Sequence, residues 1–281
     1  MLYKLERYKK MNKPKVVFSA CLLGENVRYD GKLINCPFAE QLSKYVNVIK
    51  VCPEVSIGLP VPREPIIAVK KDKKILIVNP KTGEDFTERL KNFSNSFLLS
   101  LKDIDGFLLK SKSPSCGVSG TKTYKSLDGT GFLYRGQGLF AKTVKEAFPH
   151  LPVEDELKLK NWYRKYIFLM RIFLNRELKT IDTEKFHSKY RFTLFLFNRK
   201  KSLLLDKAVK DKKKYTEIFS KMFVKLPPEK LIIKRLGKET GIIRNSFEDV
   251  YKELLNSKEN LPEDIKNFLS IVPDDIILKK V

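Results

Sequence analysis

The chain has 281 residues, 42% of them hydrophobic, so it is long enough for one large domain or two ordinary ones with a buried core. No apolar run approaches the length of a membrane-spanning helix, and the basic first stretch, Met1–Lys15, lacks the apolar segment of a secretory signal. With only four cysteines and no dense cysteine framework, the composition predicts a protein of the reducing cytoplasm that has no membrane partner.

The formal net charge of +23 is concentrated toward the end of the chain. Residues 157–281 hold 30 Lys and Arg against 16 Asp and Glu, a balance of +14, and the rest of the chain holds 26 against 17, a balance of +9. A polyanion such as RNA is the natural partner for so basic a surface. A lysine-rich surface of the kind found in heat-adapted proteins gives the same balance, and the charge alone favours neither reading.

Two short β-rich runs near the start of the chain each end at a cysteine. Val16–Ala20 ends at Cys21, and Val46–Val51 ends at Cys52. Between them, Phe38–Tyr45 has the residue spacing of a helix. The order strand, helix, strand predicts a parallel pair joined by a right-handed crossover.

A hairpin and two helices are predicted in the rest of the first half. Ile66–Val69 and Ile75–Val78 flank a lysine-rich turn, and Phe86–Leu101 has helical spacing. The stretch Gly117–Gly138 is rich in Gly, Ser and Thr, and no element is predicted there. Leu139–Phe148 has the pattern of a short amphipathic helix.

A third strand, Phe107–Leu109, runs into a loop that contains Ser113, Ser115 and Cys116. A proline and a glycine in this loop prevent the strand from simply continuing. Open parallel sheets bind ligands just beyond the carboxyl ends of their strands. We therefore expect this stretch to be a strand that ends in an active-site loop.

The composition shifts at Pro152–Leu159, and beyond it the patterns are helical. The predicted helices are Trp162–Leu178, Thr183–Phe197, Leu203–Lys210, Tyr215–Val224, Pro228–Thr240, Phe247–Leu255 and Pro262–Ile271. The sequence thus predicts an α/β domain with a Rossmann-like parallel sheet at residues 1–156, followed by an all-α basic domain at residues 157–281.

Cys21, Cys52 and Cys116 each follow an apolar strand. Because parallel strands end at one edge of a sheet, three thiolates far apart in the chain can meet there. Three thiolates suit zinc or an iron–sulfur cluster. The spacing alone is also compatible with small buried core residues. Cys36 precedes a helix instead, and we take it as a non-ligand with the opposite possibility open.

Several separated motifs carry a family resemblance. They are Ser19–Gly24 with Arg28–Gly31, Val51–Val55 with Gly58–Pro65, and Leu109–Gly117, continued by Thr130–Phe132, Gly138–Phe140 and Leu151–Glu154. Together they resemble the DUF523 family, whose best-understood members are thiouracil desulfurases. From Phe186–Tyr190 onward the chain also resembles, more loosely, the DUF1722 domain often fused behind it. Proteins that combine the two domains resemble tRNA 4-thiouridine desulfidases, in which the helical domain is thought to help hold the RNA.

The resemblance implies a 4Fe-4S cluster held by Cys21, Cys52 and Cys116, with one iron left open to bind the sulfur of a thiolated uracil. Glu54, two residues after a ligand, is then the expected base, and Ser113 the residue that orients the water or the substrate.

Six further residues carry expectations, and for the loop residues among them alternatives stay open. Lys112 and Arg63 are expected to hold a uracil oxygen or a phosphate. Ser111 or Ser115 can take the role of Ser113, and Arg63 can instead pair with Glu54 or with its neighbour Glu64. We expect His150 and His187 to be surface or capping residues.

The basic stretch of residues 199–214 is the predicted RNA-binding segment. Its cations include Arg199, Lys200, Lys201, Lys212, Lys213 and Lys214. Tyr190, Phe192 and Tyr215 are expected to stack on exposed bases beside these cations. A solvated helix face would have the same composition.

The predicted function is non-redox desulfuration of thiolated uracil, with 4-thiouridine in tRNA as the favoured substrate and tRNA or a free thiolated nucleobase as partner. Two alternatives remain at this stage. One is an RNA-binding protein with a structural metal site, and the other is an enzyme that acts on free thiolated bases only.

Overall fold

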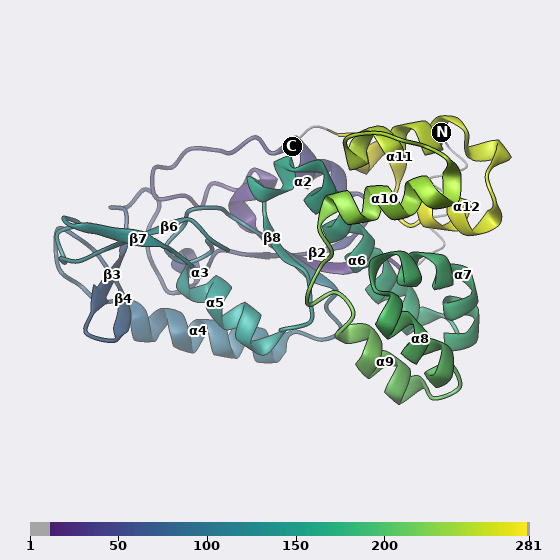
Figure 1. Ribbon diagram of the computed structural model, residues 1–281. Helices are drawn as coiled ribbons and strands as arrows, with labels where there is room; N and C mark the ends of the chain where they lie inside the picture. Colours follow the sequence, from purple (N-terminus) through teal and green to yellow (C-terminus); the bar gives the residue numbers. More distant parts are fainter. Residues whose placement is uncertain (1–11, 280–281) are drawn as a thin grey trace. The chain divides into compact units, whose positions relative to one another are not determined.

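The computed structural model describes residues 12–279 of the chain (Figure 1). Most of these residues fall into two compact units, residues 13–160 and residues 161–278. Residues 1–11, the greater part of the basic first stretch, lie outside the described residues. No helix between residues 12 and 279 is long and apolar enough to cross a membrane.

A four-stranded parallel sheet, which we name sheet A, forms the centre of the first unit. Its strands are β1 (Lys15–Ser19), β2 (Asn47–Val51), β5 (Gly106–Leu109) and β8 (Val153–Asp155), in the order β2-β1-β5-β8. Every neighbouring pair is parallel, which confirms the predicted α/β class. The order reverses direction between β1 and β5, and such a switch point is where open parallel sheets bind ligands.

Sheet A is held by apolar side chains that are fully buried. All four residues of β5 are buried, the composition expected of a strand covered on both faces. Phe107 packs with Phe140 of α5 (Leu139–Ala147) and Leu98 of α4 (Thr87–Ser100) in one core cluster. These two helices run along one side of the unit (Figure 1). Leu109, the last residue of β5, and Cys116 belong to the same cluster.

A second sheet, sheet B, has the order β4-β3-β6-β7. The predicted hairpin is confirmed as β3 (Ile67–Lys71) and β4 (Lys74–Val78), which pair antiparallel. The other two strands, β6 (Thr121–Tyr124) and β7 (Phe132–Gly136), lie where no element is predicted. All but the last residue of β7 are exposed, so the strand has no buried alternation that the sequence could show.

Short helices complete the first unit. They are η1 (Ala20–Leu23), α2 (Pro37–Ser43), α3 (Pro53–Ser56) and η2 (Lys158–Lys160). η1 follows β1 directly, and α3 follows β2 after one residue, so the chain turns sharply at the ends of both strands.

The second unit is all helical, as predicted. Its elements are α6 (Trp162–Thr180), α7 (Thr183–Phe197), α8 (Arg199–Ala208), α9 (Lys212–Ser220), α10 (Glu229–Thr240), α11 (Phe247–Asn256), η3 (Lys258–Asn260), α12 (Glu263–Leu269) and α13 (Asp274–Ile277). Helix α6 is mostly buried, and the ring of Tyr166 lies 5.1 to 5.4 Å from those of Phe247, Tyr251 and Phe268. Helices α11 and α12 are therefore packed onto α6 through aromatic rings.

Helices α8 and α9 begin three or four residues earlier than predicted because a side chain caps each of them. The backbone N–H of Lys201 donates to Asn198 Oδ1 at 3.1 Å, and that of Lys214 donates to Asp211 Oδ1 at 3.0 Å. The predicted RNA-binding cations therefore lie in the first turns of these two helices.

Candidate active site

The three cysteines predicted to meet lie at one edge of sheet A. Ser19 of β1 is level with Val51 of β2, and the residue before it, Phe18, is level with Leu108 of β5. The cysteines follow these strand ends, and all three line a single cavity of about 380 Å³. That volume suits a small-molecule ligand.

Each of the three thiols is held by its own local structure. Cys21 lies in η1, and Cys52 is the N-cap residue of α3, with its thiol directed at the carbonyl oxygen of Val27 at 3.7 Å. Burial raises the pKa of Cys21 to about 12, and the nearby Cys52 adds to this effect. Burial likewise raises the pKa of Cys116, with Cys21 and Cys52 contributing. The thiols are close enough to disfavour one another's ionisation, so a bound cation is what would stabilise them as thiolates.

The loop that carries Cys116 is packed tightly against the start of α5. The N–H groups of Leu139 and Ala141 donate to the carbonyl oxygens of Pro114 and Ser115, at 2.9 and 3.1 Å. A Cβ atom on Gly138 would lie only 2.4 Å from the Ser115 oxygen. The first turn of α5 thereby fixes the position of the cysteine loop.

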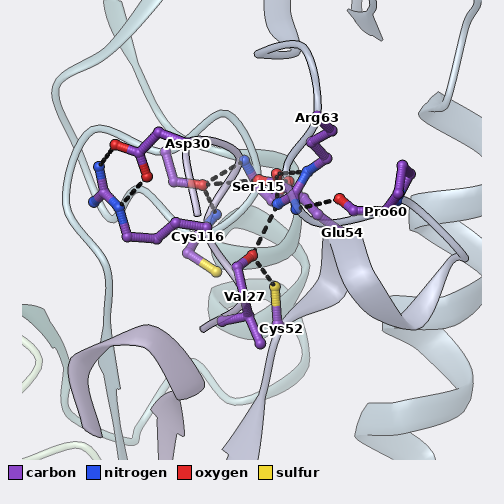
Figure 2. Close-up of polar contacts among 10 residues, drawn as sticks. Val27, Asp30, Cys52, Glu54, Pro60, Arg63, Ser115 and Cys116 are labelled. Atoms are coloured by element: carbon purple, nitrogen blue, oxygen red, sulfur yellow. Dashed lines mark hydrogen bonds and ion pairs between the residues drawn. The ribbon is translucent and has the colours of Figure 1, made fainter. Parts of the chain in front are cut away.

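Glu54 lies beside the thiols and is the centre of a polar network (Figure 2). Arg63 Nη2 donates to Glu54 Oε2 at 2.6 Å, and the hydroxyls of Ser115 and Ser113 donate to Oε1 at 3.0 and 3.3 Å. The carboxylate therefore has one oxygen in an ion pair and the other facing the cysteine loop. Figure 2 shows the sulfur atoms of Cys52 and Cys116 next to this network.

The three serines of the loop have different contacts. The Ser113 hydroxyl accepts the N–H groups of Ser115 and Cys116 while it donates to Glu54, so its hydrogen-bonding capacity is filled. Ser115 is fully buried and donates to Glu54. Ser111 also lines the cavity, and its hydroxyl donates to Glu156, which pairs with Lys110. Ser113 and Ser111 thus line the cavity and Ser115 does not, a difference within one turn that the sequence pattern cannot show.

Arg63 lines the cavity, but its guanidinium is already hydrogen-bonded to other groups of the protein. Besides Glu54 it donates to the carbonyl oxygens of Pro60 and Val27, and its side chain is only 6% exposed. The structure thus has the pairing with Glu54 that the sequence left open, and this contact orients the carboxylate.

The mouth of the cavity carries an exposed cation and an exposed ring. Lys112 has a φ of +60°, a conformation that non-glycine residues rarely adopt and that is often found at functional sites. Among the described residues no carboxylate pairs with its ammonium group. Tyr29 is 43% exposed and also lines the cavity, with the Arg28 guanidinium 5.6 Å from its ring.

Cys36 is buried as the N-cap residue of α2 and is not among the residues that line this cavity. Nowhere in residues 12–279 do three His, Cys, Asp or Glu side chains come close enough together to hold a single metal ion. The three thiols share the wall of one cavity.

Two expectations for the helical unit are wrong. His187 is buried, with Nε2 2.8 Å from Asp206 and Nδ1 3.0 Å from the Tyr215 hydroxyl, so it is not a surface residue. Tyr190 and Tyr215 are also buried and cannot stack on bases. Phe186, His187, Tyr190 and Leu194 recur at helical spacing on the core face of α7, and that periodicity is the signal that could have placed them.

The chain is an α/β protein with a cavity at the carboxyl edge of a parallel sheet, the position at which such sheets bind ligands. The sequence profile of the 2-thiouracil desulfurase family matches residues 16–156, half of the chain, and the chain belongs to this family. The matched segment contains the three cysteines and Glu54, and it ends before α6.

Two relatives each match about half of the chain. The uncharacterized protein YbbK of Bacillus subtilis (strain 168) is 28% identical over 153 residues, which are 50% of this chain and 97% of the relative. Among solved structures, the [4Fe-4S]-dependent thiouracil desulfidase TudS is 32% identical. That match covers 52% of this chain and 93% of TudS, with a TM-score of 0.41.

Proposed function

We propose that this protein removes sulfur from thiolated uracil, with 4-thiouridine in tRNA as its substrate, and that Cys21, Cys52 and Cys116 hold a 4Fe-4S cluster. The observation that carries the proposal is the gathering of three thiols and an ion-paired carboxylate around one cavity. Membership of the 2-thiouracil desulfurase family supports the same chemistry.

The residues fit such a cluster. The three thiols line one cavity of about 380 Å³. Thiolates are the protein ligands of iron–sulfur clusters, and a cluster of several irons fills the space between its thiolates. With three protein ligands, the cluster would supply one open iron as a Lewis acid for the soft thiocarbonyl sulfur.

Side chains of the protein would accept the proton that the attacking water releases. Desulfuration replaces the carbon–sulfur bond by a carbon–oxygen bond from water, and the sulfur leaves as sulfide with no change of oxidation state. Glu54 Oε1, which faces the cysteine loop, would accept a proton from that water. Arg63 holds the other oxygen and so keeps the carboxylate in place. Ser113 and Ser115 link Glu54 to the backbone around Cys116.

The mouth of the cavity would recognise the rest of the substrate. The ammonium group of Lys112, which pairs with no carboxylate of the described residues, would bind a uracil oxygen or a phosphate. The exposed ring of Tyr29 offers a surface for the base.

The tRNA part of the proposal is supported by the charge of the helical unit. Residues 157–281 carry a balance of +14. Arg199, Lys200 and Lys201 open α8, and Lys212, Lys213 and Lys214 open α9, as in the predicted RNA-binding segment. Cations so placed would track a phosphate backbone.

The test uses the full chain, reconstituted anaerobically with iron and sulfide. Wild type and the control Cys36→Ser should bind iron, show the visible charge-transfer absorption of a thiolate–iron cluster, and release sulfide from thiolated tRNA. Cys21→Ser, Cys52→Ser and Cys116→Ser should lose all three properties. Iron binding and turnover that survive in these three variants would refute the site. Sulfide release from free thiouracil but not from thiolated tRNA would refute the tRNA substrate.

A further inference from the structure

The helical unit has a cavity of its own, of about 270 Å³, beside α7 and α10. It lies wholly within residues 192–239 and shares no residue with the cysteine cavity. Its lining residues are Phe192, Phe195, Leu196, Arg199, Leu231, Lys234, Arg235, Lys238 and Glu239. The match to the desulfurase family ends at residue 156, well before this part of the chain.

Four cations face this cavity against one carboxylate, that of Glu239. Lys234 and Lys238 are exposed, lie one turn apart on α10, and form no ion pair with any described residue. Arg235 is half-buried and donates to the carbonyl oxygen of Leu196. Burial lowers the pKa of Arg235, and the charge of Arg199 lowers it further. The cavity is therefore a region of positive potential that an anion would stabilise.

The same cavity is also lined by flat side-chain groups on which a base can stack. The Arg199 guanidinium lies 4.6 Å from the centroid of the Phe195 ring, the geometry of a cation–π contact. Phe195 and Phe192 are both half-buried and line the cavity. Unpaired bases stack on aromatic rings and on guanidinium planes alike.

We propose that this cavity binds one nucleotide of a single-stranded nucleic acid, with its phosphate on Lys234 and Lys238 and its base stacked on Phe195 and Arg199. The lysines of the lining suit a phosphate, and the ring and guanidinium plane suit a base. A nucleotide is the ligand that carries both groups. A paired base in a duplex does not expose its faces, so the segment bound is single-stranded. The inference rests on the nucleic-acid part of the proposed function, with which it shares Arg199, and not on the desulfuration chemistry, because none of these residues lines the cysteine cavity.

The experiment measures binding of a fluorescently labelled oligouridylate to the full chain over a series of salt concentrations, with uridine monophosphate as a second probe. Lys234→Gln/Lys238→Gln should bind the oligonucleotide more weakly. For this variant, the slope of log affinity against log salt concentration should be smaller in magnitude by about 0.7 for each phosphate that the variant no longer neutralises. Lys225→Gln is the matched control, because Lys225 is exposed and does not line the cavity.

Phe195→Ala should weaken oligonucleotide binding by about fivefold or more without changing the salt slope. Phe195→Leu repeats this test with the apolar volume kept, should the alanine variant fold poorly. Release of sulfide from free thiouracil should be unchanged in all these variants, which separates this site from the cysteine cavity. The proposal is overturned if Lys234→Gln/Lys238→Gln keeps the wild-type affinity and slope, if Lys225→Gln loses as much, or if uridine monophosphate binds as tightly as the oligonucleotide.

Discussion

Arg63 directs two donors at a single oxygen of Glu54, with Nη2 at 2.6 Å and Nε at 3.3 Å from Oε2. The two side chains are only 6% and 12% exposed, so the pair is shielded from water. The other oxygen, Oε1, accepts two serine hydroxyls from the loop that carries Cys116. The two carboxylate oxygens therefore have different surroundings, and Oε1 is the one that would accept a proton in the proposed reaction.

Glu54→Gln should lower the rate of sulfide release by about 10²- to 10⁴-fold, because the amide keeps the shape but cannot act as a base. Iron content should stay at the wild-type level, since Glu54 is not a proposed ligand. The control is Glu64→Gln, which removes an exposed carboxylate that pairs with Lys81. A Glu54→Gln enzyme that turns over at the wild-type rate would exclude Glu54 as the base.

Lys112→Gln should raise KM for a thiolated substrate by about tenfold with little change in kcat, because a hydrogen bond from a charged donor is worth about 1.5 kcal/mol. Steady-state kinetics with the reconstituted enzyme measures both constants. Lys122→Gln is the matched control, because Lys122 is exposed on β6 and does not line the cavity. Equal KM values for the two variants would remove Lys112 from the substrate site.

Gly138→Ala should displace the loop that carries Cys116. The added Cβ would lie 2.4 Å from the Ser115 oxygen and 2.8 Å from the Gly117 nitrogen, and backbone atoms cannot move aside cheaply. We expect a loss of about 1–3 kcal/mol in stability together with reduced iron loading. Gly136→Ala is the control, because its closest neighbour, at 3.2 Å, is the side chain of the exposed Tyr134. If both variants load iron equally, the tight packing does not position Cys116.

Asp206→Asn should lower the free energy of unfolding of the helical unit at neutral pH. It should also make that free energy depend less on pH in the acid range. The hydrogen bond and charge of Arg191 lower the pKa of Asp206, and the contact with His187 lowers it further. A carboxyl group whose pKa is lowered by folding stabilises the protein above its unfolded pKa of about 3.9, and this contribution is lost as the pH falls through the folded pKa. At neutral pH the substitution should therefore cost about 1 kcal/mol.

Urea unfolding followed by tryptophan fluorescence can measure this effect, because Trp162 is the only tryptophan in the sequence and lies in the helical unit. Below pH 4 the wild type and Asp206→Asn should converge in stability. The control Glu217→Gln removes an exposed pair with Lys221 and should change little. Curves for Asp206→Asn that stay parallel to wild type at every pH would show that Asp206 does not contribute in this way.

The sequence predicted three of the four strands of sheet A and the meeting of the cysteines, because both follow from apolar runs that end abruptly. The predicted runs Val16–Ala20, Val46–Val51 and Phe107–Leu109 correspond to β1, β2 and β5, and turn-forming residues follow each of them. β1 and β5 are almost wholly buried, whereas β2 is buried only at Val51. Parallel strands then require that Cys21 and Cys52 lie at the same edge. This part of the site depends on topology alone.

What the sequence could not provide is set by side-chain contacts and by exposed strands. Strand β7 is almost wholly exposed, and β8 has only three residues, two of them acidic, so neither shows an apolar pattern. The choice between Ser113 and Ser115 depends on the turn of the loop, which no periodicity encodes. Tyr190 has basic neighbours that suggest exposure, yet its ring packs 5.1 Å from Phe186 in the core.

Cys21, Cys52 and Cys116 come from three strand ends that are 31 and 64 positions apart in the chain. No short segment brings even two of these thiols together, so the cavity comes into existence only when β1, β2 and β5 have paired. Such non-local pairing is a late and slow event for a folding chain. An unfolded chain carries the same three thiols but does not hold them around one cavity. A group bound by all three thiols would therefore depend on the pairing of these strands, and loss of sheet A would release it.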